Sequence, residues 1–95
     1  MKHRNKLLLH LYKWSPDPEF PRDYVRVGVF DVRLPWPGRT YYLYLAEVAV
    51  DDKLVVDTGL KTMLVGNHNA ALRFAFAQYE NLVNDHPNKE SLKGD

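Results

Sequence analysis

One stretch of twelve residues, Arg39 to Val50 (RTYYLYLAEVAV), constrains the fold more than any other part of the chain. Aromatic and branched residues dominate it and no glycine or proline interrupts it, which is typical of a β-strand. Its alternating positions give one face with Tyr42, Tyr44, Ala46, Val48 and Val50 and another with Tyr41, Leu43, Leu45, Glu47 and Ala49. Both faces are largely apolar, so we expect a central strand that is covered on both sides.

Four further segments have strand-like patterns bounded by turn residues. We predict strands over Lys6 to Trp14, Tyr24 to Leu34, Lys53 to Asp57 and Lys61 to Val65. In the first of these, period two places Leu7, Leu9 and Leu11 on one face and Leu8, His10 and Tyr12 on the other. The segment 15–23 has three prolines, so it is predicted to be an ordered connection, with Phe20 holding it to the core.

The second predicted strand changes its apolar phase beside Gly28. Val25, Val27 and Val29 alternate, and the apolar positions then move to Phe30, Val32 and Leu34. A β-bulge at the glycine produces such a slip. A strand buried on both faces is the alternative.

A single helix is predicted near the end of the chain, from Ala70 to about Asn84. Asn67 or Asn69 is suited to be its N-cap. An apolar stripe at helical spacing predicts the face that lies on the sheet, with Leu72, Ala75, Phe76, Tyr79, Leu82 and Val83. Phe74 and Arg73 fall outside this stripe.

These segments together predict an α+β fold, a mainly antiparallel four- or five-stranded sheet packed against one C-terminal α-helix. Residues 1–84 are expected to form a single α+β domain. Residues 85–95 are polar and are expected to be a disordered C-terminal tail. Because one helix covers one side of the central strand, the face with Tyr41, Leu43 and Leu45 needs a loop, a second copy or a partner as its cover.

Composition excludes several classes of protein. The chain has 95 residues, no cysteine and a hydrophobic fraction of 45%, which is ample for a core and excludes disulfides and thiolate metal sites. No apolar run approaches the roughly 20 residues that span a bilayer. The start, MKHRNKLLLHLYKW, has too short an apolar run and no small-residue cleavage site, so it is interpreted as a strand rather than a signal peptide. We expect a cytoplasmic protein with no membrane association.

The chemistry-bearing residues do not form a known catalytic or metal-binding motif. His3, His10, His68 and His86 lack metal-ligand spacing, so neither a metal nor another cofactor is predicted. Gly66 to Asn69 is interpreted as an N-cap turn, and Asp51 and Asp52 as a turn. With no cysteine and no glycine elbow around a serine, we predict no enzyme. An acid–base site would need His68 or His10 to meet a carboxylate.

Nucleic acid is one alternative partner. Residues 1–39 have a formal charge of +4 and the remainder −3, although strands from both parts interleave in a sheet. A single-stranded nucleic-acid-binding domain would use basic residues of the N-terminal half, namely Arg4, Lys6, Arg26, Arg33 and Arg39, beside aromatic rings that stack on bases. The chain has no RNP-like string.

Protein binding is the leading hypothesis. Trp36 lies within a Pro-Trp-Pro-Gly segment and has little conformational freedom to lose, as an interface anchor requires. We predict a non-catalytic protein-binding module acting through exposed aromatic and apolar surface, as a homodimer or with another protein. Its candidate residues are Trp36, Tyr41, Leu43, Phe74 and Arg73. From its class of sequence, the specific role that we predict is a phage or mobile-element inhibitor of a bacterial defence complex, of the anti-CRISPR kind.

Overall fold

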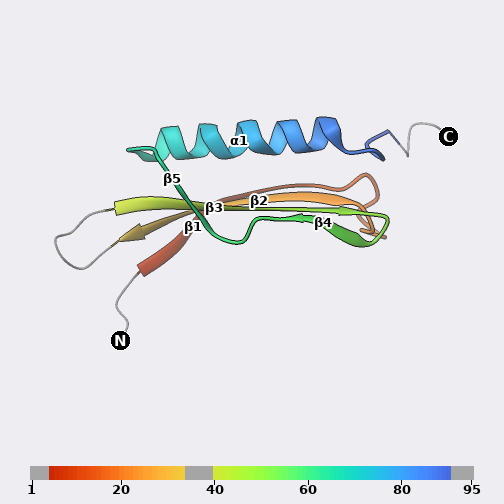
Figure 1. Cartoon of the computed structure of the whole chain (residues 1–95), viewed down its shortest axis with the longest axis horizontal. Coiled ribbons are helices and arrows are strands. Elements are labelled where there is room, and N and C mark those ends of the chain that lie inside the picture. Colours follow the sequence, from red (N-terminus) through yellow and green to blue (C-terminus); the bar gives the residue numbers. More distant parts are fainter. Residues whose placement is uncertain (1–4, 34–39, 91–95) are drawn as a thin grey trace.

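The computed structural model describes residues 5–33 and 40–90, which form five strands and one helix (Figure 1). β1 to β4 lie in chain order in one antiparallel sheet, and β5 pairs with β3. The predicted α+β fold, with its antiparallel sheet and one C-terminal helix, is therefore confirmed. The elements are β1 (Asn5–Trp14), β2 (Tyr24–Arg33), β3 (Thr40–Val50), β4 (Lys53–Asp57), β5 (Lys61–Met63) and α1 (His68–Asp85).

β3 is the central strand, as its sequence predicts. It pairs with β2 along one edge, and its other edge is shared by β4 at residues 47–50 and β5 at residues 42–44. Thr58 bridges the gap between these two short strands. Its N–H donates to the carbonyl of Ala46 at 3.1 Å, and the N–H of Ala46 donates to its Oγ1 at 2.9 Å. The backbone of β3 thus keeps its partners across the break.

The β3–β4 hairpin closes through two aspartates in the left-handed region, Asp51 (φ 51°) and Asp52 (φ 72°). Two-residue hairpin turns of this kind need positive φ at both positions, and aspartate tolerates it better than most residues. The interpretation of this acidic pair as a turn is confirmed.

The phase change in β2 has a different cause from the predicted bulge. The register between β2 and β3 is continuous from Tyr24 to Arg33, so β2 has no extra residue at Gly28. Val25, Val27 and Val29 are fully buried under the helix, and Val32, on the opposite face, is 1% exposed. The alternative interpretation, a strand buried on both faces, is correct.

The irregularity lies instead in β1, where the register against β2 shifts between Leu8 and His10. The extra residue, Leu9, moves all later side chains to the other face. Leu8 pairs with Phe30 and Leu11 with Gly28, so these two leucines share a face. The prediction that Leu11 lies on the same face as Leu9 is therefore wrong.

α1 covers one face of the sheet along most of its length (Figure 1). Asn67 is its N-cap, and the side-chain oxygen accepts from the N–H of Ala70 at 2.9 Å. Ala71 and Ala75 are fully buried, and their small side chains let the helix lie close to the valines of β2. Most of the predicted stripe packs on the core, but Phe76 remains 42% exposed.

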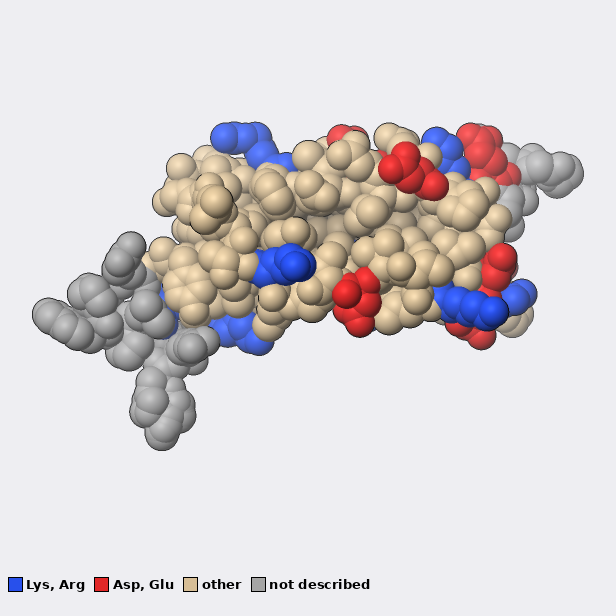
Figure 2. All heavy atoms as spheres, in the orientation of Figure 1, with Lys and Arg blue, Asp and Glu red and all other residues tan. Residues whose placement is uncertain are grey.

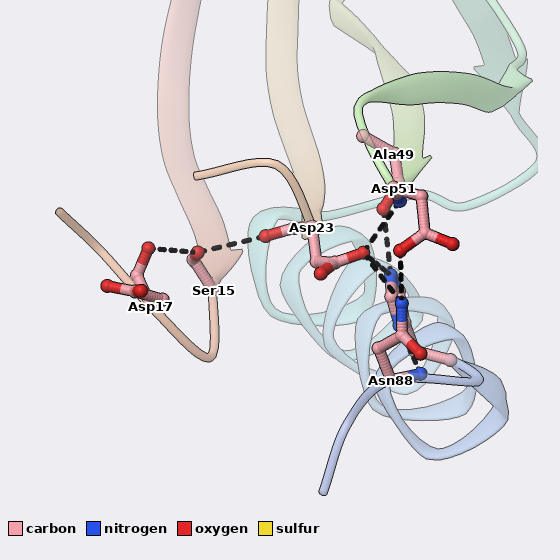
Figure 3. A network of polar contacts seen from close by, with 7 residues as sticks. Ser15, Asp17, Asp23, Ala49, Asp51 and Asn88 are labelled. Atoms are coloured by element: carbon pink, nitrogen blue, oxygen red, sulfur yellow. Dashed lines mark hydrogen bonds and ion pairs between the residues drawn. The ribbon is translucent and has the colours of Figure 1, made fainter. Parts of the chain in front are cut away.

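A polar network ties the end of α1 to the far end of the sheet (Figure 3). His86 is buried, its Nε2 lies 2.8 Å from the carbonyl oxygen of Ala49, and its Nδ1 accepts from the N–H of Asn88 at 3.0 Å. The two ring nitrogens of His86 thus join the end of α1 to β3. The amide of Asn88 also donates to Asp23 at 3.1 Å and to Asp51 at 2.9 Å.

His86 and Asn88, which follow the predicted domain of residues 1–84, belong to this network. Residues 91–95 of the predicted tail lie outside the described residues. Burial alone would raise the pKa of the Asp23 carboxyl, but hydrogen bonds from the Asp51 N–H and Asn88 outweigh it and lower this pKa below its ordinary 3.8. Phe20, predicted to hold the connection to the core, is instead 67% exposed.

Candidate protein-binding surface

The sheet has one face that α1 does not cover, here called the open face. Antiparallel partners point to the same side of a sheet, so the register defines this face. Its residues are Lys6, Leu8, Leu11 and Lys13 on β1; Tyr24, Arg26, Gly28, Phe30 and Val32 on β2; Tyr41, Leu43, Leu45, Glu47 and Ala49 on β3; and Leu54, Asp57 and Thr62 on β4 and β5. No helix or strand among the described residues packs over it.

The centre of the open face is apolar. Leu8 is 53% exposed and Leu11 is 37% exposed, while Phe30, Leu43 and Leu45 are half-buried. These five side chains come from three neighbouring strands. A contiguous apolar surface of this kind is what protein interaction sites expose.

Gly28 leaves a low point in the middle of this apolar area. A Cβ built on it would lie 3.4 Å from Cε1 of Phe30 and 3.8 Å from Cδ1 of Leu11. The ring of Phe30, two residues along the same strand, therefore leans over the bare backbone. The ring shields the glycine, and the surface at Gly28 protrudes less than at Leu11 and Leu45, which pair with it.

One row of charged residues crosses the open face from strand to strand. Lys13 of β1 pairs with Arg26 of β2, Arg26 with Glu47 of β3, and Glu47 with Asp57 of β4. The row thus has two cations on one half of the sheet and two anions on the other. Arg26 Nε donates to Glu47 Oε1 at 2.9 Å, and its guanidinium also forms an ion pair with this carboxylate. Neither Lys13 nor Asp57 forms an ion pair with another described residue.

The five residues predicted for protein binding do not form one surface. Tyr41 and Leu43 lie on the open face, both half-buried. Phe74 is on α1, 36% exposed, with its ring packed edge-on against Tyr44 at 5.3 Å. Arg73 is also on α1, where it lines a groove between the helix and β1. Trp36 lies outside the described residues.

That groove is a second, smaller apolar surface. Tyr12, Leu72 and Phe76 line it, and the rings of Tyr12 and Phe76 are 5.5 Å apart. Arg73 and Glu80 stand at its sides. Its aromatic rings already pack on one another, whereas no described helix or strand lies over the leucines of the open face. The open face is therefore the stronger candidate.

The basic residues proposed for nucleic acid are also divided. Lys6 and Arg26 are on the open face, where Lys6 Nζ lies 5.5 Å from the ring of Phe30. Arg33 alternates to the helix side and lies 3.9 Å from Asp31. Arg4 and Arg39 lie outside the described residues. Figure 2 shows basic and acidic groups interspersed over the visible side, so the charge asymmetry of the sequence does not produce a continuous basic surface there.

An imidazole and a carboxylate do meet at the other end of the helix. His68 Nε2 lies 3.3 Å from Oδ2 of Asp31, which is 1% exposed, and its ring packs edge-on against Tyr42. Asp31 Oδ1 has no hydrogen-bond partner among the described residues. Ser15, the only serine in the described part, bonds to the carbonyl of Asp23 at the opposite end of the sheet. The pair thus joins the start of α1 to β2, with no serine nucleophile beside it.

Three central residues of the open face were not marked by the sequence predictions, namely Leu8, Leu11 and Phe30. Leu45 was expected on the uncovered face but was not among the candidate binding residues. The phase change at Gly28 was a signal for Phe30, because it placed this ring opposite the buried valines. No comparable signal marked Leu8 and Leu11 as neighbours, since Leu9 interrupts the alternation between them.

Comparisons of the chain with family models, with curated proteins and with solved structures find no match. Within the described residues, no three histidine, aspartate or glutamate side chains gather in a way that could hold a metal ion. In the same part of the chain, α1 is too polar to cross a bilayer. The open face and its charged row are the features of the described residues that indicate a function.

Proposed function

We propose that this chain is a non-catalytic protein-binding module and that its open face is the binding surface. The observation that supports this most is the apolar centre formed by Leu8, Leu11, Phe30, Leu43 and Leu45, over which no described element packs. Burying such an area stabilises a complex by about 25 cal/mol per Å² before the costs of association. We place this module in the cytoplasm, as its cysteine-free sequence suggests.

The aliphatic centre favours protein over nucleic acid as the partner. Leucine side chains have no π-face on which a base can stack, and they occupy the middle of the face. Arg26, the only arginine among the described residues of this face, is already bonded to Glu47. An apolar centre beside a charged row of both signs matches the anatomy of protein interfaces, in which a polar rim surrounds a dry core.

The specific role of an inhibitor that occupies the surface of a bacterial defence complex stays a prediction. Such an inhibitor would act by covering another protein, and the open face supplies a surface suited to this. Its +1 charge makes it unlike an acidic mimic of DNA, so recognition would rest on shape and apolar contact.

Site-specific photo-crosslinking in cells that naturally contain the protein tests the proposed function. A benzoylphenylalanine replaces Leu8 or Leu43 on the open face, and the control replaces Asn81, which is exposed on the outer side of α1. We expect protein adducts from positions 8 and 43 and not from position 81. Absence of adducts, or equal adducts from all three positions, would refute the proposal.

A further inference from the structure

We infer that the partner on the open face is a second copy of this chain, packed face to face about a twofold axis that runs parallel to the strands above the line between β2 and β3. The inference rests on the proposed function, since it names the occupant of the same surface. It follows from the charged row, from the sizes of facing residues and from the available area.

An axis in this position reverses the order of the strands in the second copy. β1 of one copy then faces β4 of the other, and β2 faces β3. Each residue of β2 therefore faces, in the other copy, the same residue that it pairs with in its own sheet.

The charged row is complementary under this operation. Lys13 faces Asp57 of the second copy, and Arg26 faces Glu47. Sheets that pack face to face lie about 10 Å apart, a separation that lysine and arginine side chains bridge to reach a carboxylate. Lys13 and Asp57, which are free of ion pairs with described residues of their own chain, each gain one. Because the operation is twofold, both contacts occur twice.

The facing side chains also match in size. Leu45 faces Gly28, which has no side chain of its own and lies beside the ring of Phe30, and Tyr24 faces Ala49. A large residue opposite a small one lets two layers interdigitate without voids. Phe30 faces Leu43 at the centre, where the apolar contact is greatest.

The other face-to-face arrangement, with the axis perpendicular to the strands, does not have this complementarity. It stacks β1 on β1, which brings Lys6 of one copy toward Lys13 of the other at both ends. It also places β4 over β4 and so leaves Asp57 without a cation. Like charges in a rim oppose association, so the charges select the parallel axis.

The area of the face is sufficient for a specific dimer. Three strands of 10 or 11 residues and a fourth position shared by β4 and β5, at about 3.3 Å per residue and about 4.8 Å between strands, give roughly 600 Å² per copy. Two copies then bury about 1,200 Å², at the lower end of specific interfaces. We therefore expect a dimer that forms at micromolar concentration.

Charge exchange between Lys13 and Asp57 tests the arrangement, with dimerisation measured by analytical ultracentrifugation over a range of concentrations. Lys13→Glu and Asp57→Lys should each weaken self-association about tenfold, because each places like charges together at two contacts. An equal mixture of the two variants should restore association. In the mixed dimer, the glutamate introduced at position 13 of one chain faces the lysine introduced at position 57 of the other, and the unchanged Asp57 faces the unchanged Lys13. The double variant on one chain should restore association as well.

The restoration cannot arise within one chain, because β1 and β4 are three strand spacings apart, about 14 Å. Glu80→Lys, a reversal of the same size on the helix, is the control and should leave association unchanged. Urea unfolding of every variant checks that the fold is kept. Failure of the mixture to associate, with both variants folded, would overturn the proposed axis.

A wild-type chain that stays monomeric at 11.1 kDa up to about millimolar concentration would overturn the second copy as the partner. Photo-crosslinking distinguishes failure of the dimer from failure of the proposed protein-binding function. Adducts of twice the chain mass from position 43 support the dimer. Adducts with a different protein from the same position retain the proposed function and reject the second copy.

Discussion

Replacing Leu8 by serine should separate the stability of the fold from the stability of the complex. Leu8 is 53% exposed in the single chain, so about half of its apolar surface remains for a partner to bury. Full burial of a leucine is worth about 1.5–3 kcal/mol, and the exposed half therefore contributes roughly 0.8–1.6 kcal/mol. In a twofold dimer this contribution occurs twice. We expect Leu8→Ser to weaken dimerisation by about 1.6–3.2 kcal/mol, or about 15- to 200-fold.

The same substitution should cost the fold only about 1 kcal/mol, because the remaining half of Leu8 is already buried in the sheet. Dimerisation is measured by sedimentation equilibrium. Unfolding in urea is measured at a concentration where the chain is monomeric, since association raises apparent stability by mass action. Leu64→Ser is the matched control, because Leu64 is 99% exposed and lies outside the sheet, so neither quantity should change. A Leu8 variant that loses fold stability and dimerises like wild type would refute the reasoning.

Four further predictions concern two glycines, acid and salt. Gly28→Ala should stabilise the fold by about 0.5–1 kcal/mol in urea unfolding, because its methyl would meet Phe30 at van der Waals distance. Gly59→Ala should destabilise it by about 1 kcal/mol, because φ is +64° there. Asp23 has a lowered pKa, so its ionised form stabilises the fold above about pH 4, and this stabilisation is lost as the pH falls through the lowered value. Asp23→Asn should therefore reduce the loss of unfolding free energy at acid pH, measured by urea unfolding across that range. Filter binding of single-stranded DNA at low salt should show no retention, because Arg26 is bonded to Glu47 rather than free for phosphate. Retention that falls steeply as the salt concentration rises would contradict this.

The strands and the helix were predictable because their residues agree at the local and the tertiary level. The twelve residues from Arg39 to Val50 favour a strand by propensity, and their two apolar faces favour a central position, which β3 occupies. The helix start was marked by Asn67, whose side chain accepts the predicted kind of bond. These signals are local, so sequence alone is sufficient to detect them.

The faces of β1 were not predictable, because an extra residue in a strand changes no propensity. Leu7, Leu8 and Leu9 are identical in type, and nothing in their order marks Leu9 as the unpaired one. Leu11 pairs with Gly28 after the shift, and this contact exists only in the folded sheet. One extra residue therefore brought Leu11 onto the open face beside Leu8.

The C-terminal network was missed for a similar reason. Asn88 looks like a polar tail residue, and its amide finds Asp23 and Asp51 only after three distant segments meet. His86 resembles a residue that ends a helix, yet it is buried against Trp14, with ring centroids 5.0 Å apart. Long-range hydrogen bonds leave no periodicity in a sequence.

The outer edge of β1 is another place where two copies could join, and its composition argues against that. In its ten residues β1 has two cations, Lys6 and Lys13, and no acid. Pairing two full β1 strands antiparallel about a twofold axis sets Lys6 against Lys13 at both ends, which is unfavourable. The extra residue at Leu9 also twists the edge away from a flat partner. Protection of this edge supports the proposed association through the open face, whose apolar centre and charged row are left for a second copy.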